Sequence, residues 1–320
     1  MLQPYILCDG NSASGLGHFM RCCALANAMS TQHCRPHLLG DFIPTAQQLA
    51  AMLEIELTVN ETPIQKRPET LPPASDIILD SYVCQPGALD TRHRYVLIDD
   101  FCRFDSCPVL GVINFTVDAH QYDYGALGAH AQALGTRFFL PHPLIGPPCD
   151  ACTPEPKNIM VMIGSGDRHG LAPRILKALS SVGSFQIRVI GSHSDATRNK
   201  FPQVEFITPT PEIGRHYEWA DFCITSGGLA KYECAWLGKP AAVISQTPGE
   251  QAETKQFQRH GLCFDLGYCT DVTAEKTAEK LANILSDRHA RQQAHESCRQ
   301  HFSNDSPRAA AEFILECLNP

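Results

Sequence analysis

A histidine and an arginine one helical turn apart are the first candidates for chemistry in this sequence. An apolar segment leads into Asp9-Gly10-Asn11-Ser12-Ala13-Ser14-Gly15-Leu16-Gly17-His18-Phe19-Met20-Arg21, after which a helical pattern begins. Residues three apart share one face of a helix. A histidine exchanges protons near neutral pH, and a neighbouring cation can meet a phosphate or a developing negative charge. His18 and Arg21 therefore predict a general base with a cationic neighbour; the structural alternative is a histidine that caps loop carbonyls.

Acidic and polar side chains follow several predicted strands of the first half. Asp80 and Tyr82 come after one strand, Asp99 and Asp100 after the next, and Asn114 ends a further one. Ligands of open α/β sheets bind beyond the carboxyl ends of the strands, so these residues are candidate ligands for a sugar or a water molecule. Helix capping and turn formation are the alternative, because aspartate favours both.

Two glycine-containing loops of the second half suit a nucleotide. Gly164-Ser165-Gly166-Asp167 follows an apolar run, and Ser226-Gly227-Gly228-Leu229 opens a helix that carries Glu233. Small residues at a strand-to-helix turn let a diphosphate reach backbone amides, and a glutamate one turn later can accept hydrogen bonds from ribose hydroxyls. Tight turns alone would also explain the glycines. A dinucleotide site near residue 15 is disfavoured because Arg21 stands where the third glycine is needed, so a hydride-transferring oxidoreductase ranks last.

The elements that must position these residues alternate between short apolar runs and segments of helical period. This alternation predicts an α/β fold of parallel sheets with crossover helices. We expect strands at residues 5–8, 37–40, 57–59, 76–80, 94–99, 111–115 and 137–140, and then at 158–164, 185–191, 204–207, 221–225, 240–245 and 263–267. We expect helices in the second half at about residues 170–182, 211–219, 228–237, 250–261, 273–286, 288–301 and 307–318.

A proline-rich stretch divides the chain into two predicted domains. Residues 141–156 hold six prolines and Gly146, which neither a helix nor a central strand tolerates. We predict a Rossmann-like domain over 1–145 that holds His18, a linker over 146–157, a nucleotide-binding Rossmann-like domain over 158–306, and a C-terminal helix over 307–320 that packs back on the first domain. Two such domains facing each other would form one cleft.

Composition narrows the function classes. The chain has 320 residues, 26 Lys plus Arg against 34 Asp plus Glu, and a net charge of −8, without a basic stripe. This disfavours nucleic-acid binding and stable membrane association. The start of the chain lacks the features of a leader peptide, and the 15 cysteines, an odd number, suit reduced thiols better than disulfides. We therefore expect a cytoplasmic protein; Cys149 and Cys152 form its one C-x-x-C pair.

The region from residue 9 to residue 29 resembles the start of the pseudaminic-acid pathway UDP-sugar hydrolase family (PseG/SpsG-like). Its specific centre is Gly15-Leu16-Gly17-His18-Phe19-Met20-Arg21. The second half is similar to that family and to MurG-type transferases, and the resemblance covers nearly the whole chain through local matches. The matching segments of the second half are Glu205-Phe206-Ile207, Trp219-Ala220-Asp221, Ser226-Gly227-Gly228, Glu233, Leu237-Gly238-Lys239-Pro240 and Gln251.

The resemblance implies a GT-B fold that binds a UDP-sugar without a metal or another cofactor and releases UDP. It implies that His18 is the base on a water molecule that cleaves a UDP-linked 2,4-diacetamido-2,4,6-trideoxyhexose, within a catalytic group of Asp9, His18, Arg21 and Tyr82. The implied UDP-binding residues are Gly164, Ser165, Gly166, Ile207, Ser226, Gly227, Gly228, Leu229 and Glu233. The sugar-side candidates are Gly17, Asp80, Asp99, Asn114 and Gln251. The oligomeric state stays open.

Departures from the family pattern keep other functions in view. Ser81 stands where the family commonly has histidine, Gly146 lies in a segment that lacks the usual Arg-Pro-Glu, and the loop at 164–167 reorders its glycines. These changes affect the sugar more than the nucleotide. The alternatives are a GT-B glycosyltransferase with a UDP-sugar donor and a soluble acceptor, and a catalytically silent sugar-nucleotide-binding relative.

Overall fold

The computed structural model describes residues 3–85, 87, 89–104, 109–164, 167 and 169–319. The chain divides into two compact units. Met1–Pro143 and Asp305–Pro320 form the first unit, and Leu144–Asn304 form the second. Each unit is built around a parallel sheet, which confirms the predicted α/β class.

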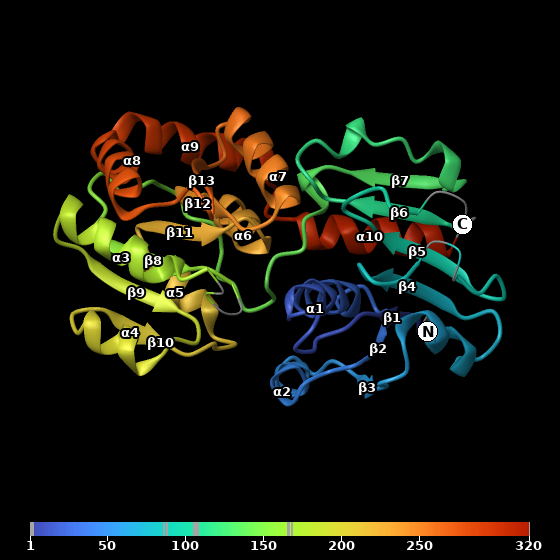
Figure 1. Cartoon of the computed structure of the whole chain (residues 1–320). Helices are drawn as coiled ribbons and strands as arrows, with labels where there is room; N and C mark the ends of the chain where they lie inside the picture. Colours follow the sequence, from blue (N-terminus) through green and yellow to red (C-terminus); the bar gives the residue numbers. More distant parts are fainter. Residues whose placement is uncertain are drawn as a thin grey trace. The chain divides into compact units, whose positions relative to one another are not determined.

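The first unit has a seven-stranded parallel sheet in the order β3-β2-β1-β4-β5-β6-β7 (Figure 1). The strands are β1 (Tyr5–Leu7), β2 (His37–Gly40), β3 (Leu57–Val59), β4 (Asp76–Asp80), β5 (Arg94–Ile98), β6 (Gly111–Asn114) and β7 (Ala131–Leu134). Its helices are α1 (Gly17–Ser30), α2 (Pro44–Met52) and α10 (Ser306–Leu318), with 3-10 turns η1 (Ile64–Thr70), η3 (Ala119–Gln121), η4 (Gly125–Leu127) and η5 (Thr136–Phe138).

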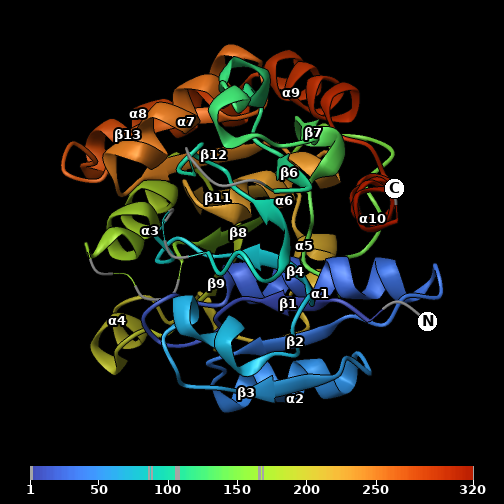
Figure 2. The same ribbon diagram turned by 90° about the vertical axis from the view of Figure 1, so that its right-hand side faces the viewer.

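The last helix, α10, belongs to the first unit although it is distant in sequence. It packs against α1, and Figure 2 shows the two helices side by side. Arg94 donates to the carbonyl of Leu318 at 3.3 Å. At Gly111, a Cβ atom would lie 2.6 Å from the Sγ of Cys317, so only glycine lets α10 approach β6 this closely.

The second unit has a six-stranded parallel sheet in the order β10-β9-β8-β11-β12-β13. The strands are β8 (Asn158–Met162), β9 (Gln186–Ile190), β10 (Glu205–Ile207), β11 (Phe222–Ser226), β12 (Ala241–Ser245) and β13 (Phe264–Tyr268). The helices are α3 (Leu171–Val182), α4 (Asp195–Lys200), α5 (Ile213–Trp219), α6 (Leu229–Leu237), α7 (Pro248–Arg259), α8 (Ala274–Ser286) and α9 (Arg288–His301).

Both sheets have apolar central strands, as parallel sheets covered on two faces require. In the first unit, Leu7, Ile77 and Leu97 are completely buried on neighbouring strands. In the second unit, Val161 and Ile224 occupy the same kind of position. These strands hold the loops at their carboxyl ends at fixed positions along each sheet.

One predicted strand is wrong. The segment at 137–140 is not a strand, because η5 covers Thr136–Phe138 and the last strand of the sheet is β7, Ala131–Leu134. The aromatic residues at 138–139 suggested a strand, whereas Ala-Gln-Ala-Leu has a weak intrinsic preference for one. Pairing of β7 with β6 over four residues overrides that preference. Helices α2 and α4 were not predicted.

Candidate active site

His18 lies in the first turn of α1, which follows the loop after β1. This position places it at the carboxyl ends of the strands of the first sheet. Its Nδ1 is 2.6 Å from Oδ1 of Asp80, the last residue of β4. The two residues meet because β1 and β4 are adjacent parallel strands whose carboxyl ends share one edge. His18 is 8% exposed and Asp80 is completely buried. The sequence prediction placed Asp80 among the sugar ligands; in the structure it lines the cavity beside His18 and is also the partner of the histidine.

Arg21 joins this pair to two further side chains. Its Nε and Nη2 donate to the two carboxylate oxygens of Asp80, each at 2.5 Å, and its Nη1 donates to Oδ2 of Asp100 at 2.7 Å. The hydroxyl of Tyr82 donates to the same Asp100 oxygen. Arg21 is 1% exposed, so its charge is compensated by buried carboxylates and not by water.

The contact with Asp80 selects the tautomer of His18. Nδ1 lies 2.6 Å from the Asp80 carboxylate, which only accepts, and 3.2 Å from Nη2 of Arg21, which only donates. Because the contact with Asp80 is much the shorter, Nδ1 carries the proton and donates to Asp80, and Nε2 keeps its lone pair in the neutral ring. This is the form that a general base needs. The ring of Tyr82 packs edge-on against the imidazole, with 4.2 Å between ring centroids, and fixes its orientation.

The electrostatics of the network keep Asp80 ionised and Tyr82 protonated. Burial alone would raise the pKa of Asp80, but the Arg21 and His18 side chains outweigh it and hold that pKa well below its usual range. Burial and the Asp100 carboxylate raise the pKa of Tyr82 well above its ordinary value. At neutral pH Asp80 is therefore a carboxylate, and Tyr82 is a phenol that donates to Asp100.

A cavity of about 190 Å³ opens beside His18 within the first unit. Its wall includes three members of the hydrogen-bonded network, His18, Asp80 and Tyr82. The lining residues are Asp9, Ala13, Ser14, His18, Asp80, Ser81, Tyr82 and Val83.

The loop before α1 uses most of its own polar groups. Oδ1 of Asn11 accepts hydrogen bonds from the amides of Ala13 and Ser14, both at 2.9 Å. Asp9 accepts from the amide of Asp41 at 3.0 Å and forms an ion pair with Arg67 at 2.7 Å. These bonds hold the loop against the sheet, and they leave its amides at 13 and 14 already occupied.

Three predicted sugar ligands of the first unit, Asp99, Asn114 and Gly17, do not line the cavity. The carboxylate of Asp99 accepts from the backbone amides of Phe101 and Arg103, at 3.3 and 2.8 Å. The side chain of Asn114 accepts from the amide of Thr116 at 2.9 Å and donates to the Tyr124 hydroxyl at 2.9 Å. Both residues are completely buried and organise loops. Gly17 is the first residue of α1 and does not line the cavity either.

The predicted phosphate loops of the second unit meet at the carboxyl edge of its sheet. A Cβ atom on Gly164, which follows β8, would lie 3.6 Å from Oγ of Ser226 and 3.9 Å from Nε2 of Gln246. Gln246 in turn donates to the carbonyl of Ile163 at 3.1 Å. Ser165 and Gly166 lie outside the described residues.

The first turn of α6 follows directly from this edge. Gly228 is the N-cap and Leu229 is the first helical residue, and the N-cap, being glycine, has no side chain to cap the amides of this turn. Such amides and the helix dipole favour an anion. Glu233, one turn later, is half-buried, and its Oε2 accepts from the Tyr217 hydroxyl at 2.7 Å.

The remaining predicted nucleotide residues lie near the same edge of the sheet. The carbonyl of Ile207, at the end of β10, accepts from the amide of Gly191 at 2.9 Å, which places the ends of β9 and β10 together. Gln251 is half-buried in the first turn of α7. Gly227 lies against α7, since a Cβ on it would be 2.7 Å from Cβ of Glu250.

Sequence reasoning missed several residues that the structure connects to these sites. Arg67 pairs with Asp9 across 58 positions of the chain, and Tyr217 reaches Glu233 from another helix. Lys231 is buried with Glu253 as its partner. The local sequence does not predict the pairs of Asp9 with Arg67 and of Tyr217 with Glu233. For Lys231 the sequence does give a signal, a lysine inside an apolar helical run, because lysine is rarely buried without a partner.

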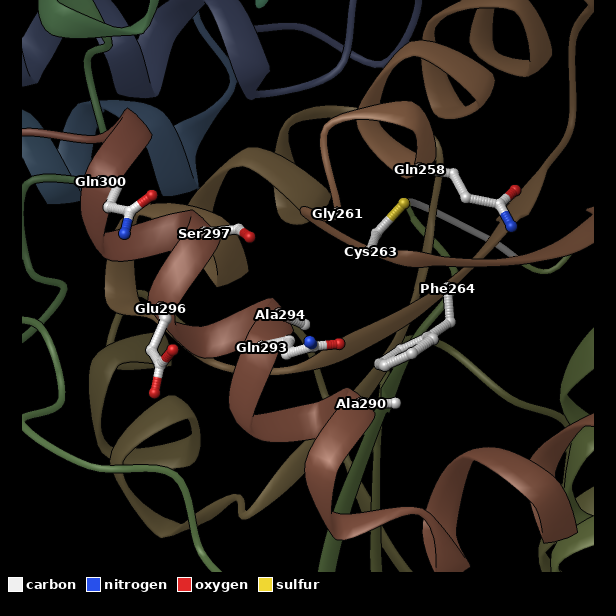
Figure 3. Close-up of a pocket in the computed structure, with 10 residues that line it drawn as sticks. All are labelled: Gln258, Gly261, Cys263, Phe264, Ala290, Gln293, Ala294, Glu296, Ser297 and Gln300. Atoms are coloured by element: carbon white, nitrogen blue, oxygen red, sulfur yellow. The ribbon is translucent and has the colours of Figure 1, made fainter.

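A hollow of about 420 Å³ in the second unit is lined by none of the described residues of the predicted sites. Figure 3 shows its two walls, one from the end of α7 to the start of β13 and the other from α9. Burial raises the pKa of the Cys263 thiol to about 12, so that this thiol is not a nucleophile at neutral pH. The lining residues are Gln258, Gly261, Cys263, Phe264, Ala290, Gln293, Ala294, Glu296, Ser297 and Gln300.

Within the described ranges, no group of three or more His, Cys, Asp and Glu side chains could hold a metal ion. Cys149 and Cys152 are half-buried free thiols. No helix in the described part of the chain is both long enough and apolar enough to cross a membrane.

Comparisons with known proteins identify the fold. The Staphylococcus aureus MnaA–UDP structure superposes with a TM-score of 0.72 at 12% identity, covering 100% of this chain and 97% of that one. Acinetobacter baumannii MurG gives a TM-score of 0.65 at 15% identity, with 99% and 100% covered. The calicheamicin glycosyltransferase CalG4 gives 0.65 at 12% identity, with 99% of each chain covered. The chain therefore has the GT-B fold.

The sequence match to a curated protein covers a smaller part of the chain than the structural matches do. A stretch of 153 residues is 29% identical to the spore coat polysaccharide biosynthesis protein SpsG of Bacillus subtilis (strain 168). The match covers 45% of this chain and 45% of that protein, so it spans less than half of the relative's length. No protein-family profile matches the chain.

Proposed function

We propose that this chain is an enzyme that removes the glycosyl group from a UDP-sugar, with His18 as general base on the incoming oxygen. The observation that carries the proposal is the 2.6 Å contact between His18 and the buried Asp80 at the wall of a cavity. A base oriented by a carboxylate activates an oxygen nucleophile. A purely structural histidine would need neither an ionised partner nor a cavity.

The proposed nucleotide site lies in the second unit. The loop at Ser226, Gly227, Gly228 and Leu229 would hold the diphosphate, Glu233 the ribose and the Ile207 backbone the uracil, with Gln251 on the sugar side. The convergence of Gly164, Ser226 and Gln246 supports this assignment. So does the fold shared with MnaA, whose structure contains UDP.

The acceptor is either a hydroxyl group or water. The named glycosyltransferases among the similar structures favour transfer to a hydroxyl, and the SpsG match supports a role in polysaccharide biosynthesis. Hydrolysis is the second candidate, because the cavity beside His18 is small and the His18 motif resembles the UDP-sugar hydrolases. In that case the substrate would be a UDP-linked 2,4-diacetamido-2,4,6-trideoxyhexose.

The charges of the first unit favour attack at carbon and not at phosphorus. Asp9, Asp80 and Asp100 face two guanidiniums, those of Arg21 and Arg67, which leaves an excess of negative charge. Such a site repels a diphosphate and stabilises positive charge that develops at the anomeric carbon. We therefore propose cleavage of the bond between the anomeric carbon of the sugar and its oxygen. With ¹⁸O-labelled water or acceptor, the label would then be found on the sugar and not on UDP.

The test is incubation of the purified protein with a panel of UDP-sugars, in water alone and with hydroxyl acceptors, while UDP and free sugar are followed by NMR. UDP release in water alone indicates a hydrolase, and release that requires an acceptor indicates a transferase. His18→Ala should abolish turnover and keep UDP affinity within about threefold, since the UDP residues lie in the other unit. Normal turnover by that variant would refute the base assignment.

A further inference from the structure

Lys231 is a buried cation of the second unit to which the proposed reaction assigns no role. It is the third residue of α6 and is 1% exposed. Lysine is almost never fully buried unless it is paired, because removing its charge from water is costly. Its position one turn after the Ser226-Gly227-Gly228 turn therefore requires an explanation.

The contacts of Lys231 lead back to that turn. Its Nζ donates to the carbonyl oxygen of Gly227 and to Oε2 of Glu253 on α7. The Tyr232 hydroxyl donates to the other Glu253 oxygen at 2.5 Å. The rings of Tyr232 and Phe257 enclose the ammonium, with their centroids 4.9 and 5.1 Å from Nζ. The carboxylate and the two rings thus hold the ammonium in one place.

This bond fixes the orientation of one peptide group. The C=O and N–H of a trans peptide point in opposite directions. Because buried Lys231 draws the Gly227 carbonyl inward, the Gly228 amide points away from the ammonium. On its other side, Gly227 packs against Glu250, where even a Cβ would clash. The peptide at the N-cap of α6 is therefore held in a single arrangement.

We propose that Lys231 is a positioning residue that presets the Gly227–Gly228 peptide for a diphosphate. The inference rests on the proposed function, because it concerns the phosphate part of the same nucleotide site. A preset turn avoids the entropic cost of ordering it when the ligand binds. Lys231 acts through the backbone, so it should affect ligands that carry phosphate and not the nucleoside.

The variants must remove the bond without leaving a buried charge. Lys231→Met alone would leave Glu253 without its cation, whereas the double variant Lys231→Met/Glu253→Gln is neutral and similar in volume. Replacement of a buried ion pair by neutral groups of similar volume is often neutral for stability. Glu253→Gln alone keeps the lysine and its bond to Gly227 but leaves the ammonium without its carboxylate, so it is the matched reference for binding once urea unfolding has shown that both variants are folded. Lys255→Met removes an exposed lysine from the same helix α7.

The measurement is the affinity of each protein for UDP, UMP and uridine, by calorimetry for UDP and NMR titration for the weaker ligands. Relative to Glu253→Gln, the double variant should bind UDP about tenfold to a hundredfold more weakly, as expected for the loss of one well-placed bond to a charged group. Its uridine affinity should stay the same. Lys255→Met should match the unmodified protein.

Two results would overturn the positioning role: equal UDP affinity in the double variant and its reference, or an equal loss for uridine and UDP. The second result would mean that Lys231 merely supports the unit. If the unmodified protein binds no UDP while its thermal unfolding is cooperative, the proposed nucleotide site itself is wrong, and the role of Lys231 falls with it.

Discussion

Asp80→Asn is the sharpest test of the catalytic role that we propose for His18 and its partners Asp80 and Arg21. The substitution keeps the shape of the side chain and removes the charge that holds His18 and Arg21. Asp80 accepts three charge-assisted bonds, one from His18 at 2.6 Å and two from Arg21 at 2.5 Å. A new amide that donates toward Nδ1 would favour the tautomer with the proton on Nε2, and the base would lose its lone pair on the cavity side.

The expected loss can be stated for activity and stability separately. A general base contributes about 10²–10⁴ in rate, so kcat should fall within this range. Breaking a buried charge pair also costs about 3–5 kcal/mol of the free energy of unfolding, because Arg21 keeps only Asp100 as a charged partner. UDP affinity should not change, since the proposed nucleotide residues lie in the other unit.

The matched control is Asp100→Asn. It removes the other carboxylate of Arg21 and should cost a similar amount of stability, but it leaves the contact between Asp80 and His18. Steady-state UDP release, UDP calorimetry and urea unfolding are measured on both variants. If both lose kcat equally, or if Asp80→Asn retains normal turnover, the orientation of His18 by Asp80 does not matter for catalysis.

Three further predictions concern binding, pH and packing. Glu233→Ala should weaken UDP binding by about 1–3 kcal/mol, and Tyr217→Phe by less, in calorimetric titrations. Burial lowers the pKa of His142 to about 4, so its neutral form stabilises the fold above its unfolded pKa of about 6.5. This stability, up to about 3 kcal/mol, should disappear as pH falls from 6.5 to 4, and His142→Gln should flatten that part of a urea-unfolding series. Gly111→Ala should destabilise the protein by about 1–3 kcal/mol, because its Cβ meets Cys317, and a normal Tm would contradict the packing.

The sequence was sufficient for the fold and for several of the side chains that the structure connects to His18. Alternating apolar and helical patterns identify both sheets, and the rule that polar residues gather at strand ends selects Asp80, Tyr82 and Asp100. The rule could not tell which of the neighbours Asp99 and Asp100 would contact Arg21. Neighbouring residues at a strand end point to opposite sides, and only Asp100 points to Arg21.

Partners from distant elements could not be predicted. Lys231 and Glu253 lie on different helices, and their contact depends on how α6 and α7 pack on the second sheet. The same holds for the strand expected at 137–140. Local propensity favoured it, but pairing along β6 places the edge strand earlier in the chain.

The return of the chain to the first unit has a consequence for biosynthesis. When residue 304 has been synthesised, every segment of the second unit exists, yet the first unit still lacks the helix that packs against α1. Helix α1 carries His18 and Arg21. The unit that is translated first is therefore completed last. A truncation that removes α10 should damage the region around residue 18 before it affects the second unit, which directly precedes α10 in the sequence.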